Sequence, residues 1–270
     1  MFDASDAEAG KRWYLKNTFK ANDGLYYTDS DGKLCIKADE KGDIIYKHTV
    51  KEVPFALNAN GHAVSFLDLD MDNLERVVMP ENIKKINIES CSFTNLKGLA
   101  NASKGKRLLQ SLFIEDTPII DGTGLDGVIG EVIFRKCKLL RSLANSKIDD
   151  VISELMIDEC DQFRSVENLP EHIDTFTLSN LPKLTSLEGI AKSLKRCRVM
   201  EFGGNMAVKS NILGILKLGV KELVHTSLRG SESVQFKKAL DIVNRHLAHA
   251  DVAECMDELM DAGLKDFAKM

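Results

Sequence analysis

The sequence contains no run of apolar residues that approaches the roughly 20 needed to cross a bilayer as a helix. Its first ten residues are acidic and small, and they lack the basic start and apolar middle of a signal peptide. There is no excess of positive charge either, since the formal net charge is −5. These absences predict a soluble, cytoplasmic protein that is attracted neither to nucleic acid nor to an anionic membrane surface.

Signatures of catalysis and of metal binding are also missing. No GxSxG nucleophile elbow, HExxH pair or phosphate-binding loop occurs. The six cysteines include no CxxC pair, so we expect buried free thiols rather than a zinc site or a disulfide framework. His246 and His249 lie three apart on an expected helix, where a solvated face is favoured because no pattern of acids or cysteines completes a site. We therefore expect no enzymatic activity, no cofactor and no bound metal.

Two short stretches imitate ligand-binding motifs. The acids of FLDLDMDNLE (66–75) begin with EF-hand spacing, but Met79 stands where that loop needs its closing glutamate. The glycines of DGTGLDG (121–127) match GxGxxG, which in a dinucleotide site opens a helix. Here strand-like alternation resumes at Ile129, so we expect the glycines to serve a turn. Neither stretch predicts a calcium or nucleotide site.

What the sequence does contain is an internal repeat. The segments IKKINIESC (83–91), ISELMIDEC (152–160) and IDTFTLSNL (173–181) share one frame of apolar positions. In this frame two inward apolar residues flank one outward residue, and Cys or Leu follows three positions later. The second inward residue recurs at steps of 19 to 26 residues, at Leu69, Ile88, Ile114, Phe134, Ile157, Leu178, Val199 and His225. In the first copy this frame makes Leu67 and Leu69 the inward pair.

The segment from about 62 to 230 resembles the leucine-rich repeat family in an irregular form. The resemblance rests on the frame IxxLxIxxC, followed by LxSL as in KLTSL (183–187), and on steps close to the family's range of about 20–29 residues. It implies an α/β protein built as a solenoid, with a curved parallel β-sheet on its concave face. It also implies a protein–protein interaction module with no chemistry of its own.

Both ends of the chain depart from the repeat, and a solenoid needs covers over its terminal coils. Residues 1–61 predict an N-terminal cap with a short helix and β-hairpins. Residues 62–230 predict the leucine-rich repeat solenoid, with about eight strands. Residues 231–270 predict a helical C-terminal cap, with Val234 on the apolar face of a first helix and Asp251 at the start of a second.

Outward positions of stacked strands form columns on one face of the sheet. The column between the inward residues begins at Asp68, places Phe113, Ile133 and Met156 one above another, and continues through Arg198 to Val224. Burying such side chains is worth roughly 1.5–3 kcal/mol each, so an apolar column left in water indicates an interface. The flanking columns carry Glu131 and Glu154 on one side, and Glu115, Arg135 and Asp158 on the other.

Together these eight residues predict a surface for another protein that has an apolar anchor and a basic rim. The alternative is a structural subunit of a larger assembly, such as a viral particle, that contacts its neighbours through its caps. No nucleic acid or membrane is expected as a partner, and the oligomeric state stays open.

Overall fold

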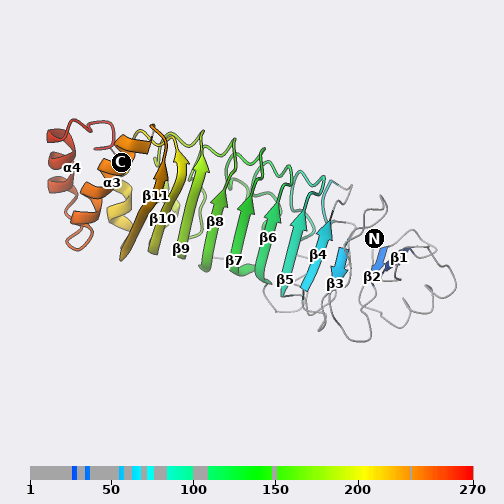
Figure 1. Cartoon of the computed structure of the whole chain (residues 1–270). Helices are drawn as coiled ribbons and strands as arrows, with labels where there is room; N and C mark the ends of the chain where they lie inside the picture. The colour runs from blue at the N-terminus through cyan, green and yellow to red at the C-terminus, as the bar shows by residue number, and fades with distance from the viewer. Residues whose placement is uncertain are drawn as a thin grey trace.

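The computed structural model describes strands at 26–28, 34–36, 55–57 and 63–67, together with residues 72–75, 84–99, 109–147, 151–231 and 233–269. The EF-hand-like acids before Asp72 and the short helix expected near the N-terminus lie outside these residues. Over the described part the chain forms a β-solenoid with a few helices, which confirms the predicted solenoid (Figure 1).

The strands of the main sheet are β3 (Phe55–Leu57), β4 (Ala63–Leu67), β5 (Lys85–Glu89), β6 (Leu109–Glu115), β7 (Val128–Arg135), β8 (Val151–Asp158), β9 (His172–Leu181), β10 (Arg196–Met206) and β11 (Glu222–Arg229). Within the described residues each strand lies beside its predecessor in the chain, in the order β11 to β3. Neighbours pair in parallel, except that β3 and β4 are antiparallel. Each coil of the chain therefore adds one strand and returns behind the sheet. A separate antiparallel pair joins β1 (Tyr26–Thr28) and β2 (Leu34–Ile36).

The helices in the described part of the chain are α2 (Ile190–Ser193), the 3₁₀-helix η2 (Leu213–Leu218), α3 (Ser233–His246) and α4 (Val252–Asp261). The first two are short pieces on the return path of the coils, where about 20 residues per coil leave little room for a longer helix. The other two follow β11 and stand beyond it at the C-terminal end of the sheet (Figure 1). None of the helices in the described part has the length and apolar character that a bilayer crossing requires.

Buried and more exposed side chains alternate along the strands, and the buried ones fill the interior of the solenoid. In β5, Ile86 and Ile88 are fully buried while Asn87 between them is partly exposed. The cysteines that follow three of the strands are also buried, and each thiol donates to the carbonyl two residues earlier, as Cys160 Sγ does to Asp158 O at 3.3 Å. Burial raises the pKa of Cys197 to about 12. The five cysteines whose side chains are described are buried and free, as expected.

The repeat frame is correct through the middle of the sheet and wrong at two places. Ile88, Ile114, Phe134, Ile157 and Leu178 are direct neighbours in register. In the first coil, however, Phe66 is buried beside Ile88, so the second inward position falls three residues before Leu69, and the backbone of Leu67 pairs with Glu89. In β10, Phe202 rather than Val199 lies beside Leu178.

Both errors are shifts of three residues, and both have the same cause. Around β4 and in β10 the apolar residues fit two overlapping alternations, so the pattern alone does not choose between them. Pairing with the neighbouring strand makes the choice, because a register error moves side chains to the wrong face. As a result Ser65 and Glu201 occupy the column that the sequence assigned to Asp68 and Arg198.

Each coil turns through left-handed backbone at two corners. The first corner directly follows the strand, and its residues Ser90, Asp116, Lys136, Glu159 and Asn180 have φ between 46° and 54°. The second corner lies on the return path, at Gly98, Gly124, Asn145, Asn168 and Gly189. Only Gly and Asn occupy the second corner, and these residues adopt left-handed backbone most readily.

The second corner explains the GxGxxG stretch. A Cβ built on Gly124 would lie 2.2 Å from the backbone carbonyl carbon of Leu96 in the preceding coil. The glycine thus allows two coils to approach closely, and β7 begins at Val128 with no helix after the motif. The expectation that these glycines serve a turn is confirmed.

Helix α3 packs against the last coils through an aromatic cluster. The ring of Phe236 meets Phe202 edge-on at 5.1 Å between centroids and stacks on Phe267 at 6.3 Å. Val234, predicted to face the core, is instead 50 % exposed. The two positions lie about 200° apart around the helix, so only one can face inward, and the larger aromatic ring takes that place.

Helix α4 begins as predicted, because the Asp251 carboxylate accepts the backbone N–H of Glu254 at 3.0 Å. The prediction of a solvated face for His246 was wrong. His246 is buried, and its Nε2 lies 2.8 Å from a carboxylate oxygen of Glu258, so it joins α3 to α4. His249 is exposed, as expected.

Candidate functional site

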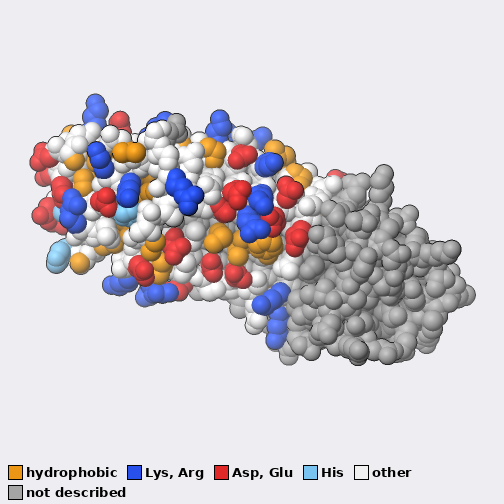
Figure 2. Space-filling view, viewed as in Figure 1, with side chains coloured by type: hydrophobic (Ala, Val, Ile, Leu, Met, Phe, Trp, Pro, Cys, Tyr) orange, Lys and Arg blue, Asp and Glu red, His pale blue; other side chains and the backbone are white. Residues whose placement is uncertain are grey.

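Three apolar side chains lie side by side on the outer face of the sheet. Phe113 on β6 pairs in register with Ile133 on β7, which pairs with Met156 on β8. Each is partly exposed, although its neighbours within the same strand are buried. We call these three residues the apolar stripe. Figure 2 shows hydrophobic side chains over this part of the sheet, with charged side chains above and below them.

Two charged rows border the apolar stripe. The upper row lies two residues further along each strand and consists of Glu115, Arg135 and Asp158. The lower row lies two residues earlier and consists of Ser111, Glu131 and Glu154. All eight residues predicted from the sequence therefore lie on one face of three adjacent strands, and their role in binding stays a prediction.

The upper row is neutralised by its own neighbours. Arg135 Nη2 donates to both carboxylate oxygens of Glu115 at 2.8 Å, and Lys136 Nζ donates to Glu115 at 2.9 Å. These two cations hold the pKa of Glu115 below its usual value. The Asp158 carboxylate accepts hydrogen bonds from the Ser179 hydroxyl and, at 2.9 Å, from Asn180 Nδ2.

Arg135 also covers one end of the apolar stripe. Its guanidinium carbon lies 5.6 Å from the centroid of the Phe113 ring, in the geometry of a cation–π contact. Its Nε is buried and has no hydrogen-bond partner. Ile133 and Met156 therefore form the more open part of the stripe.

The lower row is not neutralised. Glu131 accepts a hydrogen bond from the Ser111 hydroxyl at 2.9 Å. Glu201 on β10 lies in the column of the stripe, two strands beyond Met156, and accepts a hydrogen bond from the Thr177 hydroxyl at 3.3 Å. Glu154 receives no hydrogen bond and forms no ion pair with any described residue. Partial burial raises the pKa of Glu154, and repulsion from Glu131 and Glu201 raises it further.

We expect Glu154→Gln to stabilise the protein at neutral pH. A carboxyl group whose pKa is raised by folding favours the folded state only while it is protonated. The penalty therefore begins as the pH rises through the unfolded value near 4.5 and is complete above the raised folded value. Thermal unfolding followed by circular dichroism should show a higher Tm for the variant at pH 7.

The Tm difference should vanish at pH 3, where the carboxyl group is protonated in both states. Glu171→Gln, at an exposed position on the turn before β9, is the control and should leave Tm unchanged. A lower Tm for Glu154→Gln at pH 7 would contradict the prediction.

Glu201 is the residue of this site that the sequence analysis missed. The sequence analysis placed Arg198 in the column that Glu201 occupies, because the frame of β10 was shifted by three residues. The available signal was Met200 and Phe202, an inward pair that flanks Glu201 with the same alternation as other copies.

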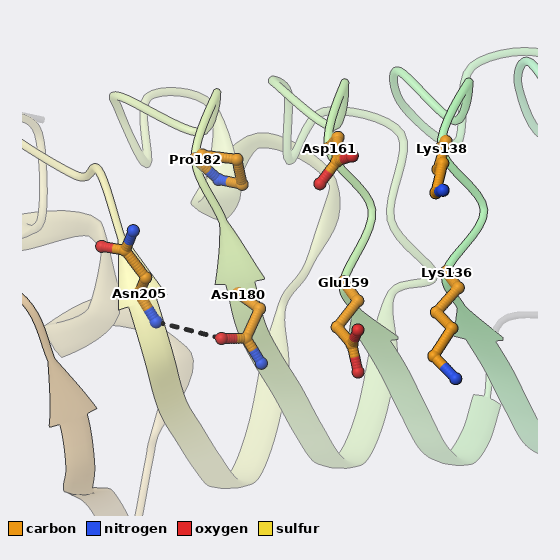
Figure 3. A pocket seen from close by; sticks show the side chains of 7 residues that line it. All are labelled: Lys136, Lys138, Glu159, Asp161, Asn180, Pro182 and Asn205. Carbon is orange, nitrogen blue, oxygen red and sulfur yellow. Dashed lines mark hydrogen bonds between the residues drawn. The ribbon is translucent and has the colours of Figure 1, made fainter.

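A pocket of about 440 Å³ lies at the upper edge of the sheet. Figure 3 shows its residues in two rows along consecutive coils, with Lys136, Glu159, Asn180 and Asn205 in the row nearer the strands. The backbone N–H of Asn205 donates to the side-chain oxygen of Asn180 at 3.1 Å. One coil contributes two lysines, the next contributes two acids, and the other lining residues are neutral, so the pocket favours neither charge.

A second pocket, of about 570 Å³, lies at the lower edge of β8 to β10. It is lined by Arg196, and by Arg198, whose guanidinium donates to both carboxylate oxygens of Asp174 at 2.7 and 2.8 Å. Both arginines are exposed, and Cys197 between them is buried. Among the described residues, no group of three or more His, Cys, Asp or Glu side chains is placed to hold a metal ion.

Comparisons with known protein families, with curated proteins and with solved structures found no match. The inference of function therefore rests on the surface of this molecule alone.

Proposed function

We propose that the protein is a non-enzymatic, cytoplasmic solenoid of the leucine-rich repeat type that binds another protein on the outer, concave face of its sheet. In this proposal β1 and β2 belong to an N-terminal cap, and α3 and α4 form a C-terminal cap. The observation that carries it is the apolar stripe of Phe113, Ile133 and Met156 at the centre of that face.

The anatomy of the face supports binding of a protein. Protein interfaces combine an apolar centre with a polar rim, and their affinity concentrates in a few central side chains. The apolar stripe supplies such a centre, and the upper and lower rows supply the rim. The stripe side chains are also not part of the hydrophobic core, which is formed by the residues on the other face of the same strands.

The double substitution Ile133→Asp/Met156→Asp should abolish partner binding. Each change places a carboxylate where the partner would bury apolar surface, and roughly 1.5–3 kcal/mol of burial is lost per side chain. Affinity capture from the native cell extract with the wild type and the variant, followed by mass spectrometry, measures the loss. Circular dichroism and the urea midpoint should confirm that both proteins are folded.

Ile120→Asp/Leu139→Asp is a matched control, since it replaces two exposed apolar residues outside the stripe with carboxylates and changes the net charge equally. It should retain the partner. A partner that is held equally by the wild type and the stripe variant would contradict binding at this face.

The second candidate is a structural subunit that contacts its neighbours through its ends. One observation favours it: Met256 and Met260, one helical turn apart on α4, are 40 % and 54 % exposed. Loss of assembly in Met256→Asp/Met260→Asp, with assembly intact in the stripe variant, would favour this candidate over the first.

A further inference from the structure

The carboxylates on the two sides of the apolar stripe differ in whether they have hydrogen-bond or ion-pair partners. Glu115 in the upper row already holds two cations, and Asp158 holds two hydrogen-bond donors. In the lower row, Glu154 is partly buried beside Ile133 and Met156, and no described residue donates to it. The carboxylate that lacks a positively charged partner therefore lies on the lower side of the stripe.

Among the residues that the structure describes, none forms an ion pair with Glu154. Arg135 and Lys136 are engaged by Glu115, and Arg198 is engaged by Asp174. Lys85, in the lower row, is separated from Glu131 by the strand that carries Ser111, and no ion pair joins them. A partner that buried the stripe without a cation would leave the Glu154 carboxylate desolvated and unpaired, which is costly.

We propose that the partner binds through a basic, apolar segment that sets a lysine or arginine cation against Glu154, between Glu131 and Glu201, with an apolar side chain on Ile133 and Met156. This inference rests on the proposed function and names the chemistry of its partner. The cation forms charge-assisted hydrogen bonds with the carboxylate and relieves the repulsion among the three glutamates. Its aliphatic stem packs against the stripe while its head stays in the lower row.

Two synthetic peptides test the proposal with the full-length protein. One alternates leucine and lysine within glycine-serine flanks, and the other carries glutamine at each lysine position. Fluorescence anisotropy at low and moderate salt gives their dissociation constants. We expect the wild type to prefer the lysine peptide by roughly tenfold, because an ion-paired hydrogen bond outweighs a neutral one. The preference should shrink as salt is added.

Glu154→Gln should remove most of this preference while it retains the weaker binding of the glutamine peptide. Asp257→Asn, at an exposed position on α4, changes the net charge equally and should retain the preference. Equal affinity of the wild type for the two peptides, no binding of either, or a preference that persists in Glu154→Gln would overturn the proposal.

The stripe variant separates this inference from the proposed function. If Ile133→Asp/Met156→Asp loses the captured partner but Glu154→Gln keeps it with unchanged affinity, the outer face binds protein and the cation site is wrong. If the stripe variant keeps the partner, the proposed function itself fails.

Discussion

Gly124→Ala is expected to destabilise the protein by about 3–5 kcal/mol, the range of severe backbone and packing disruptions. Two costs combine at this position. The backbone has φ of 84°, where an L-residue is strained. The new Cβ would also lie 2.2 Å from both the Leu96 carbonyl carbon and the Lys97 backbone nitrogen, so two coils would have to separate. Urea unfolding followed by circular dichroism measures the loss.

Gly219→Ala is the matched control. Its backbone is also left-handed, with φ of 63°, but apart from the adjoining chain no described atom lies within 4 Å of the position a Cβ would take. This variant isolates the backbone strain, which costs roughly 1–2 kcal/mol. If both variants lose the same stability, the close approach of the coils at Gly124 makes no contribution, and our account of the second corner is wrong.

The central coils could be predicted because one rule acts there without competition. In β5 to β9 the inward slots hold Ile, Leu, Val or Phe, and one outward residue, polar or apolar, lies between them. Only one register therefore buries the pattern. At β4 and β10 two registers bury the pattern equally well. The choice there depends on contacts with a neighbouring strand, which no local pattern contains.

The candidate site, too, could be predicted from the sequence only in part. The apolar stripe followed from alternation, since Phe113, Ile133 and Met156 occupy equivalent positions of consecutive coils. The pairing within the charged rows did not follow, because it depends on side-chain geometry between coils. Arg135 could reach a carboxylate on either side, and only the structure shows that it holds Glu115 and covers Phe113. The distinction between a neutralised upper row and an open lower row is therefore structural information.

Phe236→Ala is expected to cost about 3–5 kcal/mol, which is typical of a buried phenylalanine. Its ring is fully buried between Phe202 in β10 and Phe267 near the C-terminus, so its loss opens a cavity where α3 meets the last coils. Val234→Ala, on the exposed side of the same helix, should change stability by less than about 0.5 kcal/mol.

The strands that lose protection in this variant show whether α3 acts as a cap on the neighbouring coils or stabilises the whole core. In a solenoid each coil contacts only its neighbours, so loss of the cover should release the adjacent coils before the distant ones. Hydrogen exchange should therefore accelerate first in β11 and β10 of Phe236→Ala, while β6 and β7 stay protected. Uniform acceleration across the sheet would mean that the solenoid unfolds as a single unit. In that case α3 would stabilise every coil equally, and the proposal of a C-terminal cap that acts on its neighbouring coils would fail.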